Sequence, residues 1–245
     1  MGRKPSSREH THDGRHLSPC HVTVAVVFQA RARSCQVLLW QRARPPFEDR
    51  WALPGGYLEP GETLEESIRR HLATKVDVRE VAHLEQLATL SDPARTPNEW
   101  QLATAHLGLV PKDVDPQLPP DTTWHRVEAL PPMAYDHGSI VALGRERLRA
   151  KLSYTNVGFA LAPPEFTLSD LREIYAAALG HDVSATNLQR VLIRRDVIEP
   201  TGARRTSGPA GGRPGSLFRF RTRGLEITDQ FAVLRPPGPA RVPVA

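Results

Sequence analysis

The chain has 245 residues, enough for two domains that each bury a core, and it carries a formal net charge of +5. Two cysteines, Cys20 and Cys35, are too few for a disulfide framework, and no apolar run approaches the roughly 20 residues that span a bilayer. We therefore predict a cytoplasmic protein without a membrane partner. The basic balance is compatible with a nucleic-acid partner but does not demonstrate one.

Residues 1–18 carry charge but no apolar core, so we predict a disordered tail and not a signal peptide. Residues 21–30 and 35–43 are rich in β-branched or apolar side chains and predict a hairpin of buried strands. Further strand-like runs are expected within 81–92, 100–111 and 123–130. Together these segments predict a mixed sheet.

A glycine-rich turn at Gly55 and Gly56 leads into a helix with a marked start. Thr63 is expected as its N-cap, with Glu66 three residues later to complete a capping box. An apolar stripe follows at helical spacing, formed by Leu64, Ile68 and Leu72. The segment therefore predicts a helix with one buried face.

This stretch resembles the Nudix box, with Gly56, Glu62 and Arg70 at matching positions. The resemblance implies that a glutamate after the arginine and a later glutamate pair hold a divalent metal against a diphosphate. Here those three positions are His71, Thr74 and Lys75, and Asp77 replaces the glycine that usually follows.

Positions 71, 74 and 75 share one helix face, because they stand at i, i+3 and i+4. An imidazole, a hydroxyl and an ammonium do not suit magnesium, which prefers oxygen ligands. We therefore expect no catalytic residue, no metal site and no required cofactor. Lys75 could hold a diphosphate without cleaving it, or be only a solvated helix charge. A displaced metal site remains open, built from Glu59, Glu62, Glu65 and Glu66.

From Tyr135 the pattern becomes helical again, with Ile140, Leu143 and Leu148 expected to face the sheet. Such a helix would complete an α/β/α sandwich that ends near Leu152. Pro163 and Pro164 then separate it from a different pattern.

The second pattern begins with a helix capped by Thr167 and Asp170 and ended by Gly180. Another helix, capped by Ser184, follows almost at once. Two helices joined by so short a turn indicate a helix-turn-helix, although many helical hairpins look alike.

Two short strands, 197–201 and 216–221, are expected after these helices, joined by a loop rich in glycine, proline and arginine. Residues 190–223 hold nine arginines and two acids, a local excess of 9 − 2 = +7. Such a loop suits a wing that lies over the sugar-phosphate backbone while the preceding helix enters the major groove. A basic surface hairpin without a partner is the alternative.

A degenerate Nudix box followed by this arrangement resembles the Nudix-related transcriptional regulators of the NrtR family, most clearly in residues 135–180 and 212–220. The resemblance implies a sensor domain that binds ADP-ribose or a related NAD nucleotide. It also implies repression of genes of NAD metabolism, or in some members of sugar catabolism, by a homodimer on palindromic double-stranded DNA.

The predicted fold is α+β: a disordered tail (1–18), a Nudix-like sandwich that senses an effector (19–152), a winged helix-turn-helix domain (153–223) and a proline-rich tail (224–245). The expected effector-binding residues are Arg42, Trp51, Gly55, Gly56, Glu62, Arg70 and Lys75. Trp51 could also simply pack beneath the helix, and Arg42 could be a plain surface arginine. The expected DNA-binding residues are Ser184, Thr186, Asn187, Gln189, Arg190, Arg194, Arg195, Arg204, Arg205 and Arg213.

Two other functions remain open. The chain could be a Nudix hydrolase of nucleoside diphosphate derivatives with an atypical metal site, in which the second domain only docks partners. It could also be a nucleotide-binding adaptor that does not bind DNA.

Overall fold

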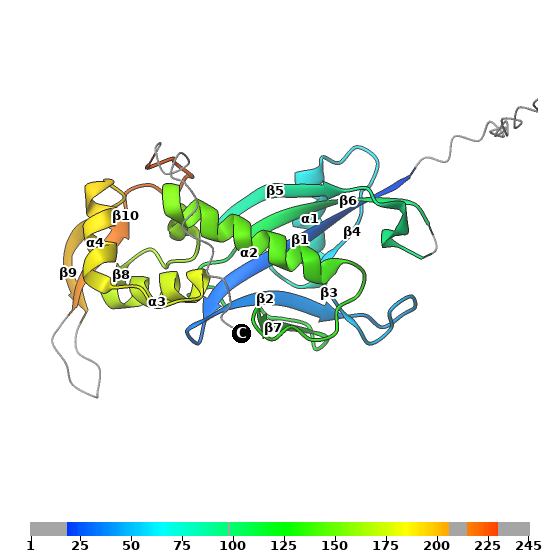
Figure 1. Ribbon diagram of the computed structural model, residues 1–245, viewed down its shortest axis with the longest axis horizontal. Coiled ribbons are helices and arrows are strands. Elements are labelled where there is room, and N and C mark those ends of the chain that lie inside the picture. Colours follow the sequence, from blue (N-terminus) through cyan, green and yellow to red (C-terminus); the bar gives the residue numbers. More distant parts are fainter. Residues whose placement is uncertain (1–18, 98, 206–214, 230–245) are drawn as a thin grey trace, which may run out of the picture.

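The computed structural model describes residues 19–97, 99–205 and 215–229 (Figure 1). The predicted N-terminal tail, Arg213 and most of the proline-rich tail lie outside these residues. None of the helices within these ranges is both long and apolar enough to cross a membrane.

The larger sheet is mixed, as predicted. Its strands follow the order β3-β2-β1-β6-β5, with β4 also paired to β1 and β7 to β2. The pair β1–β6 is parallel and the other pairs are antiparallel. The strands are β1 (Cys20–Arg31), β2 (Ser34–Gln41), β3 (Trp51–Ala52), β4 (Gly55–Tyr57), β5 (His83–Leu90), β6 (Gln101–Leu109) and β7 (Thr122–Arg126). The glycine turn therefore forms a short strand, β4, against the start of β1.

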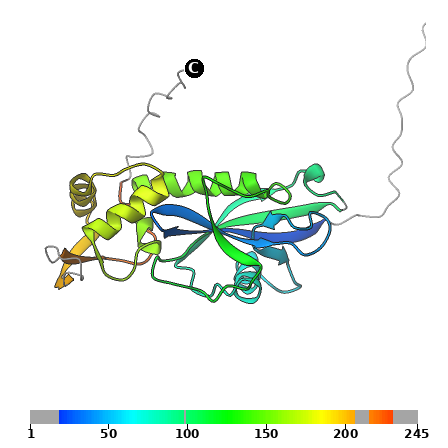
Figure 2. The same cartoon turned by 90° about the horizontal axis from the view of Figure 1, so that it is seen from below.

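Two helices cover opposite faces of this sheet, α1 (Leu64–Lys75) and α2 (His137–Tyr154) (Figure 2). The capping box predicted at Thr63 and Glu66 is present. Ile68 is completely buried, in a cluster that includes alternate residues of β1. The other alternate residues of β1 face α2, which gives the predicted α/β/α sandwich.

One residue predicted to face the sheet from α2 does not. Ile140 and Leu148 are buried, but Leu143 is 42% exposed. The face that meets the sheet instead contains Gly144, where an added Cβ would lie 2.6 Å from Val26 Cγ1. The helix rests so closely on β1 that only glycine fits there, and this contact turns Leu143 toward solvent.

The second part of the chain is a winged helix. The short 3-10 turn η2 (Val157–Ala160) leads to a sheet of order β8-β10-β9. The elements of the winged helix are β8 (Phe166–Thr167), α3 (Leu168–Leu179), α4 (Ala185–Arg194), β9 (Ile198–Arg205) and β10 (Gly215–Phe220). The Thr167 capping box, the left-handed Gly180 and the Ser184 cap are all present. Strand β9 is longer than the predicted 197–201 and continues into the basic loop.

The start of the predicted loose tail is attached to the fold. Asn156 accepts a hydrogen bond from the Glu226 amide through Oδ1 (2.8 Å) and donates one from Nδ2 to the Gly224 carbonyl (2.8 Å). The Thr228 amide donates to the Tyr154 carbonyl at 2.8 Å. Residues 224–229 therefore bind the end of α2, a contact between distant segments that composition alone does not reveal.

The two parts of the chain pack against each other through one core. This cluster runs from Val24 in β1 to Phe220 in β10 and includes residues of α2 and α3. Glu173 of α3 also lies 3.2 Å from Arg33 and 3.7 Å from Lys112. The domain limits predicted at 152 and 153 stay a prediction, since α2 continues across them to Tyr154.

Candidate functional site

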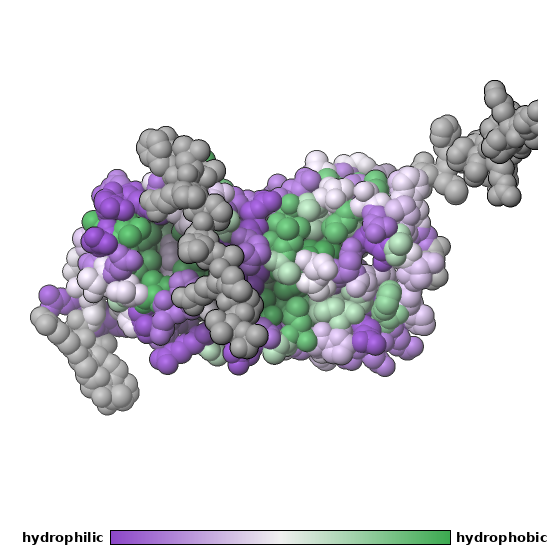
Figure 3. All heavy atoms as spheres, viewed as in Figure 1, coloured by the Kyte–Doolittle hydropathy of each residue, from purple (hydrophilic) through white to green (hydrophobic). Residues whose placement is uncertain are grey.

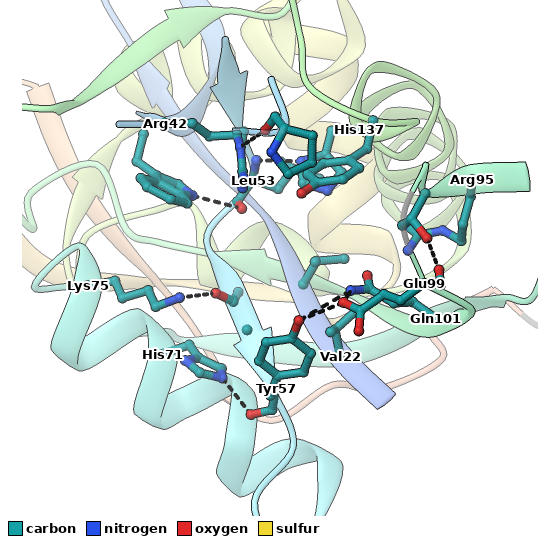
Figure 4. A pocket seen from close by; sticks show the side chains of 18 of the residues that line it. Val22, Arg42, Leu53, Tyr57, His71, Lys75, Arg95, Glu99, Gln101 and His137 are labelled. Carbon is teal, nitrogen blue, oxygen red and sulfur yellow. Dashed lines mark hydrogen bonds between the residues drawn. The ribbon is translucent and has the colours of Figure 1, made fainter. Parts of the chain in front are cut away.

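A cavity of about 480 Å³ lies beside the glycine turn, between β1, β2, β4, the end of α1 and the start of α2 (Figure 4). Its wall also includes residues 95–97 and 99, from the loop before β6. Of the seven residues expected to bind an effector, it brings together Arg42, Gly55, Gly56 and Lys75. The cavity is therefore built around the turn that the sequence singled out.

Two cations of this wall lie close to the same aromatic ring. The Arg42 guanidinium lies 5.9 Å and the Lys75 ammonium 5.8 Å from the centre of the Trp40 ring. Lys75 Nζ donates to the Gly55 carbonyl at 2.6 Å. Partial burial, helped by the charges of Arg70 and Arg42, lowers the pKa of the Lys75 ammonium. The wall thus carries fixed positive charge next to the glycine turn.

The three degenerate box positions are engaged with the protein itself. His71 Nε2 lies 3.0 Å from the Tyr57 carbonyl, and Thr74 Oγ1 donates to the Arg70 carbonyl at 2.8 Å. A Cβ at Gly56 would lie 2.5 Å from His71 Cε1 and 3.0 Å from Lys75 Nζ, so these side chains pack directly on the turn. Within the described residues, no three histidine, cysteine or acidic side chains are grouped to hold a metal ion.

Glu62, Arg70 and Trp51 were expected at the effector site but do not line the cavity. Arg70 Nη2 donates to Glu62 at 2.8 Å, and this guanidinium lowers the pKa of the Glu62 carboxyl to about 2. The pair instead ties α1 to the loop before it. Trp51 packs edge-on against His125, with 4.3 Å between the ring centres.

The acidic residues considered for a displaced metal site also have partners. Glu66 accepts from the Thr63 amide at 2.8 Å in the capping box, and Glu65 accepts from Arg69 Nε at 2.9 Å. Glu59 lies 3.2 Å from Arg70, and of these four glutamates it alone lines the cavity.

Several lining residues were not anticipated from the sequence, among them Tyr57, Arg95, Glu99, Tyr135 and His137. Arg95 is almost completely buried and lies 2.7 Å from Asp136, the N-cap residue of α2. The segment of Arg95 carried no motif. Asp136 lies at the start of the predicted helical pattern, in the stretch that resembles the NrtR family, but that resemblance did not point to an ion pair with Arg95.

The second candidate surface is the exposed face of α4. Leu188 and Leu192 are buried, and Ser184 caps the helix by accepting from the Asn187 amide at 3.3 Å. Arg190 Nη2 donates to Asn187 Oδ1 at 2.9 Å, so the guanidinium and the side-chain amide lie next to each other on α4. The predicted residues that are exposed along this helix are Ser184, Thr186, Asn187, Arg190 and Arg194, with Gln189 partly exposed.

Arg195 was expected to face DNA, but the structure contradicts this prediction. Its side chain is only 11% exposed, and Nη2 lies 2.6 Å from Asp229. Nη1 donates to the Ser153 carbonyl, in the last turn of α2, at 2.8 Å. The end of α4 turns this side chain inward, so Arg195 joins three segments of the protein.

Two of the arginines predicted to contact DNA from the wing lie at the end of β9. Arg204 and Arg205 end β9 and are exposed, and Arg205 also lies 2.7 Å from Asp170. Figure 3 shows many hydrophilic side chains over the winged-helix part of the molecule. A DNA role for these residues stays a prediction.

Comparisons with known proteins cover both parts of the chain. The Nudix domain family matches residues 19–143, and the NrtR DNA-binding winged helix domain family matches residues 158–220. The chain is 47% identical over 60 residues to the putative 8-oxo-dGTP diphosphatase 2 of Mycobacterium tuberculosis, which covers 24% of this chain and 42% of that protein.

Two relatives extend over both parts. The ADPR responsive transcriptional repressor NtrR of Acinetobacter baylyi is 32% identical over 210 residues, 83% of this chain and 82% of that protein. The structure of Shewanella oneidensis NrtR complexed with a 27mer DNA is similar with a TM-score of 0.69 at 28% identity, over 82% of this chain and 93% of that chain. The chain therefore belongs to the NrtR family of Nudix-related transcriptional regulators, with a Nudix domain followed by a DNA-binding winged helix.

Proposed function

We propose that this protein is a homodimeric repressor whose Nudix domain senses ADP-ribose, or a related NAD nucleotide, without hydrolysing it. The observation that carries the proposal is the pair of cations, Arg42 and Lys75, that both lie within 6 Å of the Trp40 ring centre beside the glycine turn. A diphosphate accepts charge-assisted hydrogen bonds from such groups, which are stronger than neutral ones. The ADP-ribose response named for the Acinetobacter relative supports the choice of ligand.

Repression would act through paired recognition helices on a palindromic site in the cytoplasm, with the protein bound to the nucleoid. Half-sites about 34 Å apart tolerate little misfit between two such helices. Because one core joins the two parts of each chain, effector binding is expected to alter how two chains are placed relative to each other. A tenfold change in DNA affinity requires that the effector prefer one arrangement by about 1.4 kcal/mol.

The donor set at positions 71, 74 and 75 supports the proposed absence of hydrolysis. His71 and Thr74 are bonded to backbone carbonyls, and the ammonium of Lys75 repels a divalent cation. A Nudix hydrolase remains the second candidate, favoured by the match to a diphosphatase over 60 residues. Formation of AMP and ribose 5-phosphate from ADP-ribose with magnesium or manganese would decide between them, and turnover at the rate of an ordinary enzyme would contradict the sensor.

The direct test measures DNA binding and effector binding together. We expect the purified protein to shift duplex DNA from its own upstream region at low salt, and ADP-ribose to change that affinity at least tenfold. Adenosine and ribose, which lack the diphosphate, serve as controls. A protein that binds ADP-ribose but no DNA would be the adaptor instead, and a protein that binds neither would contradict the whole proposal.

Base-reading and phosphate-binding arginines should respond differently to substitution. We expect Arg190→Ala, on the exposed face of α4, to relax sequence preference because base contacts carry specificity. Arg204→Ala, at the end of β9, should weaken all duplexes alike and reduce the salt slope by about 1. Fluorescence anisotropy on operator and scrambled DNA at several salt concentrations measures both. A change of preference at one base pair in the Arg204 variant would contradict these roles.

A further inference from the structure

His137 is the first residue of α2 and forms part of the cavity wall (Figure 4). The residue is 5% exposed. Its Nδ1 accepts a hydrogen bond from the Leu53 backbone amide at 2.9 Å. A nitrogen that accepts from an N–H carries no proton of its own, so this bond places the single proton of a neutral ring on Nε2.

The surroundings keep this imidazole neutral. Burial lowers its pKa to about 4. Of the nearby charges, Asp136 acts to raise the pKa, whereas Arg95 and Arg42 act to lower it. The Asp136 carboxylate is bound to Arg95, and the Tyr135 ring packs against His137 with 5.3 Å between the ring centres. The ring therefore keeps one tautomer across the physiological range.

Within residues 19–97, 99–205 and 215–229, Nε2 of His137 has no hydrogen-bond partner. This nitrogen is not fully buried, so its N–H is accessible from the cavity, and a molecule bound there can accept a hydrogen bond from it. Figure 4 shows His137 and Lys75 on separate parts of the wall. The Arg42 guanidinium lies 5.0 Å from the centre of the Tyr135 ring, and this ring packs against His137.

We propose that the Nε2–H of His137 donates to an uncharged acceptor on the adenosine part of the effector, while Arg42 and Lys75 hold the diphosphate. This inference rests on the proposed function, because it assigns a further contact in the same cavity. A neutral donor adds no charge, so it suits a base nitrogen or a ribose oxygen beside aromatic rings. His137 thus determines which nucleoside part is accepted, independently of the anion.

The variant His137→Asn tests the two ring nitrogens separately. The asparagine Oδ1 can replace Nδ1 as acceptor for the Leu53 amide, whereas its Nδ2 donor does not reach the position of Nε2. We expect ADP-ribose and AMP to bind about tenfold more weakly in isothermal titration, whereas pyrophosphate binds as before. The matched control is His181→Asn, an exposed histidine of the winged-helix part, which should change none of these affinities.

Between pH 8 and 5.5, the affinity of the parent protein for ADP-ribose should show no rise that depends on His137, because the ring is neutral over this range. Any pH dependence over this range should therefore be the same in the His137→Asn variant. In ¹⁵N-histidine spectra of the full chain, Nδ1 should be unprotonated and the Nε2 proton should shift when ADP-ribose is added. This spectrum tests the assignment even if the variant does not fold.

Each outcome has one meaning. If the parent protein binds no ADP-ribose, the proposed function fails. If the parent binds and folded His137→Asn binds equally well, or if pyrophosphate is weakened as much as AMP, the assignment of His137 to the adenosine part is overturned. A proton on Nδ1, or an Nε2 signal that ignores the ligand, overturns it as well.

Discussion

Replacing Lys75 by glutamate is expected to weaken ADP-ribose binding by about 100-fold or more. The parent ammonium is fixed at the cavity wall by its bond to the Gly55 carbonyl, and it contributes a charge-assisted hydrogen bond to a diphosphate. Loss of such a bond costs roughly 1.5–3 kcal/mol, and a carboxylate at the same place adds repulsion. Isothermal titration of both proteins measures the difference.

The control for this change is Arg79→Gln, which removes a positive charge from the loop after α1, outside the residues that line the cavity. Its affinity should stay within twofold of the parent. We also expect the parent titration to be the same with EDTA as with magnesium, because Lys75 supplies the positive charge. Equal affinity of parent and Lys75→Glu, or binding lost on chelation, would contradict this role for Lys75.

The sequence was most informative where function and structure depend on local spacing. The capping boxes at Thr63 and Thr167 each need only two residues three positions apart, so they could be located without a fold. The degenerate Nudix positions lie on one helical face for the same reason. Burial also follows from periodicity, except at Leu143, where the close approach at Gly144 rotates the helix face.

Sequence was least informative where the site depends on contacts between distant segments. Tyr135 and His137 reach the cavity because α2 begins beside β3, and Arg95 because a loop 41 residues earlier pairs with Asp136. Arg70 and Glu62 were expected to bind the effector because charge alone cannot show that they bind each other. Local patterns predict the elements, whereas tertiary pairing decides which charges remain available.

Helix α2 connects the two candidate sites. Its first residue, His137, lines the cavity, and its penultimate residue, Ser153, accepts a hydrogen bond from Arg195 at the end of α4. The same guanidinium binds Asp229 in the segment that follows the winged helix. Arg195 is therefore placed to fix the orientation of α4 against the sensor, a role that differs from contacting DNA.

Arg195→Ala should reduce operator affinity about tenfold without changing the salt dependence of binding. Removal of one member of a largely buried ion pair destabilises a fold by about 3 kcal/mol. A displaced α4 then loses base contacts. The number of phosphates neutralised stays the same, since Arg195 is turned inward. Anisotropy at several salt concentrations, with thermal melting, measures both effects.

The neighbouring Arg194 provides the matched comparison, because it is exposed on α4. Arg194→Ala should leave the melting temperature unchanged and reduce the salt slope by about 1, the reverse of the Arg195 variant. Asp229→Asn should resemble Arg195→Ala, because it breaks the same ion pair, although it removes no arginine and Asp229 lies outside α4. If Arg195→Ala instead lowered the salt slope while Asp229→Asn behaved like the parent, Arg195 would be a DNA contact after all, and α4 would be oriented by other residues.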